Sequence, residues 1–337
     1  MMMKKAVFLN RGRASIDRVY NCEIQEKLAS ELDFIPECYD LKKIEENPSD
    51  LLEVEYVFST WGMLHMSEEQ IKKYLPSLKA VFYGAGSVQE FAREFLSCGV
   101  SIFSAWGANG VPVAEFTVAQ IILASKGYFQ RFHRYTNDTW SNRANGGDSY
   151  DGMFETNIGI IGAGMIGKMV INMLKPYTVN VHVFDPFLPD SAAAEMGVNK
   201  VATIPELFEK CDVISNHLAN NAQTVGMINA ESFDEMKKNA VFVNTGRGAQ
   251  VVESDLIAAL KAEPLRVALL DVTEPEPPRP DSDLYNLDNV FLSPHIAGSI
   301  GHEVWRQADY MYEEYKSFDA GKATRFRVTS KMLETMA

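Results

Sequence analysis

A glycine pattern at residues 157–167 (NIGIIGAGMIG) restricts the fold of this chain more than any other segment. Gly162, Gly164 and Gly167 form G-x-G-x-x-G. The pattern lies between an apolar run at 158–161, which predicts a strand, and a run at 165–174, whose periodicity predicts a helix. The first glycine of such a pattern permits a tight turn, the second lets a pyrophosphate approach the backbone, and the third allows close packing of helix on strand. The pattern predicts an α/β domain that binds a dinucleotide with its phosphates at the helix amino terminus.

The acidic residue after the next predicted strand bears on which dinucleotide is bound. That strand, 179–184, ends in Asp185, roughly 20 residues beyond the glycines, where a carboxylate meets the ribose hydroxyls of the adenosine. A carboxylate there disfavours a 2′-phosphate, and no lysine or arginine follows until Lys200, so the sequence predicts NAD rather than NADP as the cofactor. Alternatives from the residues alone are a flexible turn, a Rossmann-like domain that has lost its ligand, and a helix cap for Asp185.

Short apolar runs alternate with helix-period segments along the rest of the chain, which predicts parallel sheets with crossover helices. With 337 residues, the chain exceeds the roughly 250–300 at which one hydrophobic core stops growing, so we expect two domains. A mostly apolar helix at 113–127 follows Pro112, a first-turn proline, and is expected to bridge the two domains. The first domain has predicted strands at 6–9, 56–59, 80–83 and 101–103 and helices at 24–32 and 88–96.

Charge and cysteine content exclude several classes of partner. The 32 basic and 45 acidic residues give a net charge of −13, which repels a nucleic-acid backbone. Four scattered cysteines without a C-x-x-C pair predict neither a metal site nor a disulfide framework, and favour a reducing compartment, the cytoplasm. The longest apolar stretch, 111–123, contains Pro112, Glu115 and Gln120, which favours a buried helix over a membrane span.

Four further apolar runs in the second predicted domain end in polar residues and predict strands at 213–215, 240–243, 267–270 and 290–292. Because an open parallel sheet binds ligands beyond the carboxyl ends of its strands, we expect these residues to converge on one crevice. Surface loops also collect polar residues, so a structural role stays open on placement alone. The polar residues are Asn216 and His217, then Asn244, Thr245, Gly246 and Arg247, then Asp271, then Ser293 and His295.

Three of these loops carry groups suited to the chemistry of a small acid. Arg247, between two glycines, could bind a carboxylate with two parallel hydrogen bonds, unless it forms only a surface salt bridge. His295 could donate or accept a proton at neutral pH, unless it is a core histidine. A carboxylate bonded to its imidazole would fix the tautomer and favour the protonated form, and both Glu276 and Glu274 are placed to do so.

Five segments resemble, in order, the D-isomer-specific 2-hydroxyacid dehydrogenases. The resemblance covers nearly the whole chain and implies that Arg247 binds substrate, that His295 is the acid and base, and that Asp271 contacts the nicotinamide amide. The family pattern pairs the histidine with the glutamate at the fifth position after the aspartate, which selects Glu276 over Glu274. The segments are VAEFTVAQIILA (113–124), the glycine pattern with Asp185, NTGRG (244–248), LLDVTEPEP (269–277) and SPHIAGS (293–299).

The resemblance also implies two doubly wound domains. A flavodoxin-like catalytic domain would comprise 1–111 and 305–337, an NAD-binding Rossmann domain would be inserted at 112–304, and the helix at 113–127 would form a homodimer. The loop after the strand at 80–83 would bind the substrate carboxylate, with a plain tight turn as the alternative. Its residues are Gly84, Ala85, Gly86 and Ser87. The resemblance implies that the glycines of the pattern contact the cofactor, together with Asp185, Asp271, Arg247 and His295. Further implied contacts are Met165, Ile166, His217, Thr245, Gly246 and Gly298. Candidate pocket walls are Trp61, Trp106, Trp140 and Trp305.

The activity implied by the resemblance is hydride transfer between nicotinamide C4 and C2 of a small 2-oxo or 2-hydroxy acid, with His295 as acid and base. The family alternatives are an NAD(H)-sensing corepressor-like protein and a formate or phosphite dehydrogenase. Two positions depart from the family pattern: Val88 stands where an aspartate is common, and Ala219 where a proline is common. The first could alter the anchoring of the carboxylate loop, and the second removes a rigid residue.

Overall fold

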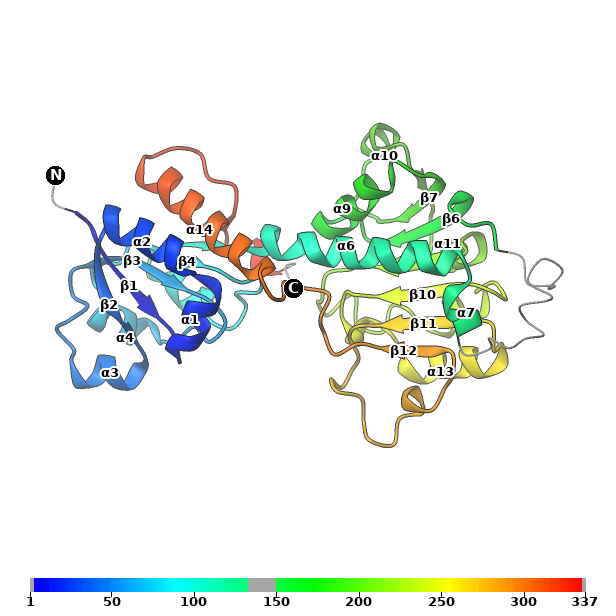
Figure 1. The fold of residues 1–337 in the computed structure, drawn as a ribbon, viewed down its shortest axis with the longest axis horizontal. Helices are drawn as coiled ribbons and strands as arrows, with labels where there is room; N and C mark the ends of the chain where they lie inside the picture. Colours follow the sequence, from blue (N-terminus) through cyan, green and yellow to red (C-terminus); the bar gives the residue numbers. More distant parts are fainter. Residues whose placement is uncertain (1–2, 133–149, 335–337) are drawn as a thin grey trace. The chain divides into compact units, whose positions relative to one another are not determined.

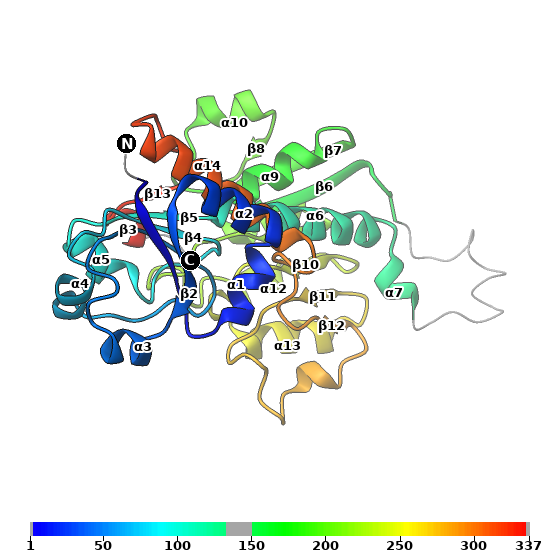
Figure 2. The same ribbon diagram turned by 60° about the vertical axis from the view of Figure 1, so that its left-hand side comes forward.

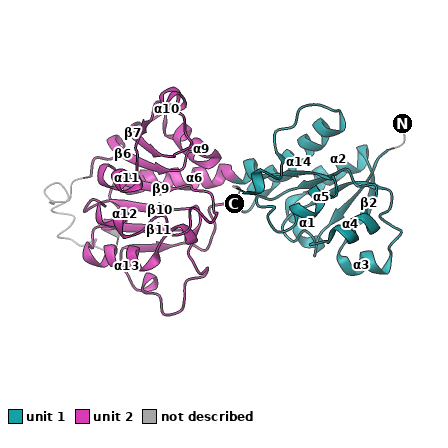
Figure 3. Ribbon diagram, turned by 180° about the vertical axis from the view of Figure 1, so that it is seen from behind, with its two compact units in different colours: residues 1–109, 299–337 teal, residues 110–298 magenta. Residues whose placement is uncertain are grey.

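The chain forms two compact units in a computed structural model, which describes residues 3–132 and 150–334. One unit comprises Met1–Asn109 and Ser299–Ala337, and the other Gly110–Gly298 (Figure 3). The boundaries differ by a few residues from those expected at 111 and 305. The segment from Ser299 onward belongs to the first unit, and the N–H of Ser299 donates to the Asn109 side chain of that unit over 3.0 Å. Trp140, a candidate pocket wall, lies outside the described residues.

The first unit is built on a six-stranded sheet with the order β13-β5-β4-β3-β1-β2, in which only β13 is antiparallel. The parallel strands therefore have the flavodoxin-like order 2-1-3-4-5. The strands are β1 (Lys5–Leu9), β2 (Asp33–Tyr39), β3 (Val54–Ser59), β4 (Ala80–Tyr83), β5 (Ser101–Ser104) and β13 (Arg327–Val328). The edge strand β2 was not predicted, because it contains Pro36 and lacks a regular alternation of apolar and polar residues.

Helices cover both faces of this sheet because its strands are apolar on both sides. In β1, Val7 packs into one hydrophobic cluster and Phe8 into the other, as alternate side chains of a strand must. The first cluster includes residues of α3 (Leu41–Glu46), α4 (Glu68–Tyr74) and α5 (Ala92–Ser97). The second includes residues of α1 (Arg13–Val19), α2 (Cys22–Glu31) and α14 (Glu303–Asp319), which lie side by side in Figures 1 and 2. The predicted helix at 88–96 begins later, at Ala92, because residues 88–91 form a turn.

The second unit is built on a seven-stranded, entirely parallel sheet with the order β12-β11-β10-β9-β6-β7-β8. This is the Rossmann order 3-2-1-4-5-6 with one more strand, and the order reverses between β6 and β9. The strands are β6 (Phe154–Ile161), β7 (Thr178–Phe184), β8 (Asn199–Lys200), β9 (Val213–Asn216), β10 (Val241–Asn244), β11 (Val267–Leu270) and β12 (Val290–Leu292). The helices are α7 (Tyr128–Phe132), α9 (Met165–Leu174), α10 (Asp190–Met196), α11 (Ile204–Lys210), α12 (Ala230–Asp234) and α13 (Glu253–Ala262).

The helix α6 (Trp106–Ser125) runs from the first unit into the second and corrects the predicted helix start at Pro112. Pro112 lies inside the helix, where it removes one backbone hydrogen bond at a cost of about 3 kcal/mol. The preceding turn forms despite this cost because Ala108 is fully buried and Gly107 packs against the ring of Phe326. A β-carbon at Gly107 would lie 2.4 Å from that ring, so only glycine allows this close contact. Glycine also has a low helix propensity, which is why the local sequence indicates a helix only weakly here.

The same helix α6 is long and apolar enough to qualify as a membrane span by length and composition alone. A little over half of its most apolar window, 56%, is buried inside the protein. The core helix of a globular domain passes the same test, so this is weak evidence for a span. Within α6, Thr117 is fully buried and its hydroxyl is hydrogen-bonded to that of Thr245 over 2.9 Å.

Candidate active site

The glycine loop between β6 and α9 has the shape that a pyrophosphate requires. Gly162 has φ +90°, and a β-carbon there would lie 2.9 Å from the carbonyl oxygen of His217. At Gly167 a β-carbon would lie 2.1 Å from the carbonyl oxygen of Gly162, so the helix packs directly on the loop. At Gly164, by contrast, a β-carbon would meet nothing within 4 Å. The open position, at the amino terminus of α9 where backbone N–H groups are unpaired, fits a dinucleotide phosphate.

The first turn of α9 is held in place on its other side by α6. Met165 and Ile166, the predicted backbone contacts of the cofactor, direct side chains toward Gly110, where a β-carbon would lie 2.9 Å from the methyl group of Met165. The backbone N–H groups of this turn therefore have a fixed direction. A fixed set of donors binds an anion without the entropic cost of ordering them first.

Asp185, at the end of β7, joins the glycine loop to the neighbouring strand. Its Oδ2 accepts the N–H of Ala163 and its Oδ1 accepts the N–H of Phe187, both over 2.8 Å. An ionised carboxylate offers about four acceptor positions, so two remain for ribose hydroxyls. The local capping role and the predicted ribose role are compatible at this residue.

Substitutions at the second and third glycines, Gly164 and Gly167, should separate an effect on cofactor binding from an effect on folding stability. Gly164→Ala should leave the melting temperature within about 2 °C of the parent and weaken NADH binding roughly ten-fold or more, because the methyl group occupies open space that a phosphate would need. Gly167→Ala should lower the stability by about 1–3 kcal/mol, because its methyl group overlaps backbone. Thermal unfolding and titration of NADH fluorescence on both variants measure the two effects. Equal NADH affinities for Gly164→Ala and the parent would contradict the assigned phosphate position.

A buried network of three amide side chains shapes the loop that carries Arg247. Asn216, Asn244 and Gln250 are each at most 1% exposed. The Nδ2 of Asn216 donates to Asn244 Oδ1 over 3.0 Å and to Gln250 Oε1 over 2.6 Å. The same Oε1 accepts the N–H of Arg247 over 3.3 Å, and Asn244 Nδ2 donates to the Arg247 carbonyl over 3.1 Å. Since each amide is satisfied by another, the network fixes the backbone of Arg247.

Gln250 was missed as a site residue in the sequence. Its signal is a polar side chain in an otherwise apolar run, which predicts a buried hydrogen-bonding role. Its Nε2 donates to the carbonyl groups of Leu218 and Ala219 over 2.8 and 2.9 Å. These two bonds anchor the loop in which Ala219 replaces the proline common in the resembled family.

The Arg247 guanidinium lies half-buried, with Nη1 donating to the carbonyl of Gly246 over 2.7 Å. Burial lowers the pKa of Arg247, and the charge of Glu276 raises it. The loop reaches Glu276 through Gly248, where a β-carbon would lie 1.9 Å from the carbonyl carbon of Thr273. Close backbone contact at this glycine brings the arginine loop against the loop that carries the glutamate.

Asp271, at the end of β11, holds the loop that carries His295. Its Oδ1 accepts the hydroxyl of Ser293 over 2.6 Å and the N–H of Ile296 over 2.9 Å, while its Oδ2 accepts the N–H of Ala297 over 2.9 Å. Its backbone carbonyl accepts the N–H of His295 over 3.0 Å. Asp271 is 2% exposed, so the structure gives it a positioning role. Its contact with the nicotinamide amide stays a prediction.

His295 and Glu276 form a hydrogen-bonded pair, with 2.6 Å between Nδ1 and Oε1. An ionised carboxylate only accepts hydrogen bonds, so Nδ1 carries a proton and Nε2 is the atom left for chemistry. The backbone of His295 has φ +53°, an unfavourable conformation for a residue with a side chain. Asp271 maintains this conformation through its bonds on both sides of His295.

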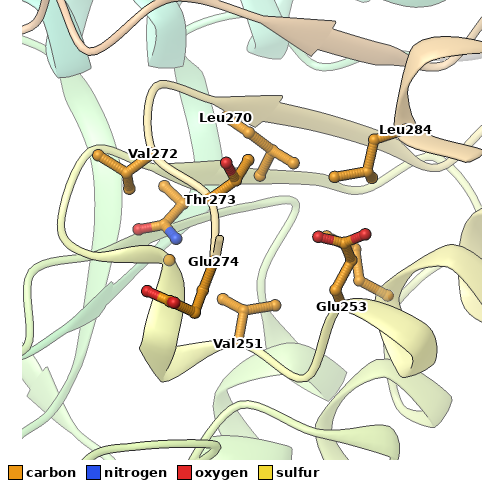
Figure 4. Close-up of a pocket in the computed structure, with 10 residues that line it drawn as sticks. Val251, Glu253, Leu270, Val272, Thr273, Glu274 and Leu284 are labelled. Atoms are coloured by element: carbon orange, nitrogen blue, oxygen red, sulfur yellow. The ribbon is translucent and has the colours of Figure 1, made fainter. Parts of the chain in front are cut away.

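The structure separates Glu276 from its sequence rival Glu274. Glu274 lines a cavity of about 20 Å³, room for about one water, together with Glu253 and the apolar side chains of Val251, Val272 and Leu270 (Figure 4). Arg247, Glu276 and His295 do not line that cavity. The histidine partner is therefore Glu276.

His217 follows β9, beside the glycine loop. Burial lowers its pKa to about 4, so the imidazole is neutral near pH 7. Its Nε2 lies 2.9 Å from the hydroxyl of Ser215. With Gly162 packed on its carbonyl, His217 lies where the strand order of the sheet reverses. Its role toward a cofactor, like those of Thr245, Gly246 and Gly298, remains a prediction.

In the first unit, the loop Gly84, Ala85, Gly86 and Ser87 is fixed by its carbonyl groups and offers its N–H groups. The carbonyl of Gly84 accepts the hydroxyl of Thr60 over 2.8 Å, and that of Ala85 accepts the hydroxyl of Ser104 over 2.9 Å. Among the described residues, the N–H groups of Ala85, Gly86 and Ser87 have no acceptor. Val88, 1% exposed, anchors the loop by packing in the core where the resembled family often has an aspartate. The loop is therefore suited to bind a carboxylate.

Two further expectations concern metals and tryptophans. Within residues 3–132 and 150–334, no group of three or more histidine, cysteine or acidic residues could hold a metal ion.

Trp106 packs on Phe326 and Trp305 stacks on His302, whereas Trp61 is 39% exposed and lines a cavity of the first unit.

The two doubly wound sheets, the glycine loop and the paired histidine and glutamate define the class of NAD-binding 2-hydroxyacid dehydrogenases. Residues 118–297 match the family model "D-isomer specific 2-hydroxyacid dehydrogenase, NAD binding domain". The chain belongs to this family, and the resemblance drawn from its motifs is confirmed. The match covers the Rossmann domain, so an NAD-type cofactor is a property of the family.

Several relatives show the range of proteins to which the chain is similar. It is 34% identical over 201 residues, 60% of its length, to a D-3-phosphoglycerate dehydrogenase of Methanocaldococcus jannaschii, of which the alignment covers 38%. Over 293 residues, 84% of its length, it is 29% identical to a glyoxylate reductase of Korarchaeum cryptofilum, of which 87% is covered. The chain spans less than half of the D-3-phosphoglycerate dehydrogenases it matches, with 37–47% covered.

A solved structure supports the fold of the whole chain. The structure of a phosphoglycerate oxidoreductase from Rhizobium etli superposes with a TM-score of 0.76, at 21% identity, covering 98% of this chain and 99% of the other. The expected fold class, two parallel α/β domains of which one is a Rossmann domain, is confirmed.

Proposed function

We propose that this protein is an NAD-dependent D-2-hydroxyacid dehydrogenase that works as a 2-oxo acid reductase. The observation that carries the proposal is the 2.6 Å pair between His295 Nδ1 and Glu276 Oε1, on loops packed against the loop of Arg247. All three residues follow strands of the sheet whose glycine loop fits a dinucleotide. An anion-binding guanidinium and an oriented imidazole are the two groups that reduction of a 2-oxo acid needs from the protein.

The chain's own residues bind the reactants and move the proton. The glycine loop, Met165, Ile166 and Asp185 would hold the dinucleotide, with His217, Thr245, Gly246, Asp271 and Gly298 on the nicotinamide side. When bound, the cofactor supplies or accepts a hydride at nicotinamide C4, which is exchanged with C2 of the substrate. Arg247 binds the substrate carboxylate and polarises the carbonyl, so the negative charge that develops on its oxygen meets a donor already in place. His295 donates a proton from Nε2 to that oxygen, while Glu276 keeps the ring oriented.

Further parts of the proposal concern specificity and assembly. The N–H groups of Ala85, Gly86 and Ser87 would bind the substrate carboxylate, as the family resemblance implies. Asp185, with its carboxylate at the end of β7, supports a preference for NAD over NADP. We also propose a homodimer through the 113–127 region of α6 and a cytoplasmic location, as expected from the family pattern and from cysteine use.

Turnover on a substrate panel tests the proposed activity. We expect NADH absorbance to fall when the protein is incubated with one or more of glyoxylate, hydroxypyruvate, pyruvate and phenylpyruvate, because the histidine, glutamate and arginine act on any 2-oxo acid that fits. The His295→Asn variant is the matched control. Tight NADH binding without turnover of any 2-oxo acid would support an NAD(H)-sensing protein instead. NADH formation from NAD with formate or phosphite, but not with 2-hydroxy acids, would instead support a formate or phosphite dehydrogenase.

A further inference from the structure

A cavity of about 210 Å³ lies at the carboxyl edge of the first unit's sheet, where the loops after three parallel strands meet. Arg11 follows β1, Trp61 and Met63 follow β3, and Tyr83 and Ser87 belong to β4 and the loop after it. Open parallel sheets bind ligands at this edge. A volume below the roughly 300 Å³ of the smallest drug-sized sites fits a small ligand, or one end of a larger one.

Buried hydrogen bonds hold the walls of this cavity in place. Asn10 is 1% exposed, and its Nδ2 donates to the carbonyls of Thr60 and Trp61 over 3.2 and 2.9 Å. The N–H of Arg11 donates to the carbonyl of Gly62 over 2.8 Å. Gly62 has φ +96°, and a β-carbon there would lie 2.8 Å from Asn10 Oδ1, so only glycine allows this contact without strain. The cavity is therefore pre-formed, which lowers the cost of ligand binding.

Three donors around the cavity lack a partner in the described part of the chain. The guanidinium of Arg11 makes no hydrogen bond or ion pair with the described residues. Tyr83 is only 6% exposed, yet its hydroxyl bonds to none of them, and neither does the hydroxyl of Ser87. Burial raises the pKa of Tyr83, and Glu90 raises it further, so the hydroxyl keeps its proton. Of the three donors, only Tyr83 is buried, and a buried polar group normally has a partner. Arg11 and Ser87 are exposed to solvent, so their side chains can turn toward a ligand in the cavity that offers acceptors.

The balance of charge around the cavity also favours an anion. The guanidinium of Arg18 stacks over the ring of Trp61 at 5.7 Å, which adds a second positive charge beside the cavity. Glu90 is the acidic residue that lines it, but its side chain is 81% exposed and lies 3.2 Å from His65 Nε2. Its charge is screened by solvent more than that of a buried group.

We propose that this cavity binds a second anionic group of the substrate: a carboxylate, phosphate or sulfonate at the far end of a 2-oxo acid. This inference rests on the proposed function. Arg11 binds the anion, and Tyr83 and Ser87 donate hydrogen bonds to it. Ser87 belongs both to this cavity and to the loop proposed to bind the C1 carboxylate, so a substrate of a few carbon atoms reaches both. The substrate class is thus a 2-oxo acid with two anionic groups.

Matched pairs of 2-oxo acids test this specificity. We compare oxaloacetate with 2-oxobutyrate and 2-oxoglutarate with 2-oxovalerate, and we include phosphohydroxypyruvate and sulfopyruvate to distinguish the kinds of anion. The parent protein should show a higher kcat/KM for at least one dianion than for its matched monoanion. In Arg11→Met, kcat/KM for that dianion should fall by roughly 10- to 100-fold, as expected when a charged hydrogen-bonding partner is lost, and that for the monoanion by less than about two-fold.

Two further variants distinguish a local charge effect from general damage. Arg13→Met is the control, because Arg13 lies two residues from Arg11 in the sequence and its guanidinium is already bonded to Asp17 and Gln25. The Arg13→Met variant should keep the parent's preference for dianions. Glu90→Gln should raise the preference for dianions a few-fold, by removing a like charge, a change that a merely structural role would not produce.

The outcomes separate this inference from the proposed function. A parent protein that prefers the monoanions, or an Arg11→Met variant that keeps the parent's dianion preference, would overturn the cavity assignment while leaving reduction of 2-oxo acids in place. Absence of turnover on every 2-oxo acid would count against the proposed function itself. In that case, calorimetric titration of the cofactor-free protein with oxaloacetate still tests the cavity, because binding should be weakened at least about ten-fold in Arg11→Met.

Discussion

His295→Asn should reduce kcat for 2-oxo acid reduction by roughly 10²- to 10⁴-fold, the usual contribution of a positioned general acid. Asparagine can bond to Glu276 but carries no proton that it can transfer at neutral pH. NADH affinity should change by less than about three-fold, because the proposed binding of the cofactor depends mainly on the glycine loop and Asp185. The side chain of His295 is 48% exposed, so stability should stay within about 0.5 kcal/mol of the parent. Stopped-flow kinetics, NADH titration and thermal unfolding measure the three quantities.

The control for this prediction is His302→Asn, at the start of α14, because this histidine stacks on Trp305 and has no carboxylate partner within residues 3–132 and 150–334. It should leave kcat within about two-fold of the parent, as is usual for a substitution outside the reacting groups. A His295→Asn variant with kcat near that of the parent would remove His295 from the mechanism. An equal loss of turnover and NADH affinity would instead indicate a role in the structure of the cofactor site.

Arg247→Met should lower kcat/KM for 2-oxo acids by roughly 10²- to 10⁴-fold, because two charge-assisted hydrogen bonds to the substrate are lost at about 1.5–3 kcal/mol each. Both KM and kcat should change, since in the proposed mechanism Arg247 binds the carboxylate in the ground state and polarises the carbonyl in the transition state. Arg247→Lys should recover only part of the loss, because an ammonium group cannot reproduce two parallel bonds. Steady-state kinetics at saturating NADH separate the two parameters.

The matched control for Arg247 is Arg279→Met, an exposed arginine in the loop that follows Glu276. This variant removes the same charge from the second unit and should keep kcat/KM within about two-fold of the parent. If Arg279→Met and Arg247→Met lowered kcat/KM equally, the effect would be one of general charge. If Arg247→Met retained the parent's kcat/KM, the assignment of the substrate carboxylate to Arg247 would be wrong.

Elements with strong local signals were predicted to the residue, whereas those shaped by packing were not. The structure confirms α9 at Met165–Leu174, β11 at Val267–Leu270 and β12 at Val290–Leu292, where an apolar run or a helical period is bounded by clear breakers. The edge strand β2 and the first turn of α6 were missed. Both depend on neighbours: β2 pairs with β1 despite its proline, and α6 extends past Pro112 because the turn before it is buried.

In the candidate site, too, residues with a local sequence signal were predicted, whereas those that depend on tertiary contacts were not. Periodicity located Arg247, His295 and Asp271 after strands, because polar residues that end apolar runs are visible in a linear sequence. The network of Asn216, Asn244 and Gln250 was not anticipated, because its members are up to 34 residues apart and gain meaning only from their mutual hydrogen bonds. Periodicity could not choose between Glu274 and Glu276. The family pattern favoured Glu276, and in the structure Glu276 Oε1 lies 2.6 Å from His295 Nδ1.

The amino-acid sequence alone determined the two-domain α/β class and the glycine loop, and it predicted the reactive side chains, because strand alternation, helix periodicity and glycine spacing are local properties of a chain. The tertiary structure places Glu276, the glutamate that the family pattern selects, against His295, and it alone decided which buried amides orient Arg247. It also revealed that Arg11, Tyr83 and Ser87 face one cavity of the first unit. These are contacts between loops far apart in sequence, and their free energy depends on distance and burial, which no linear pattern contains.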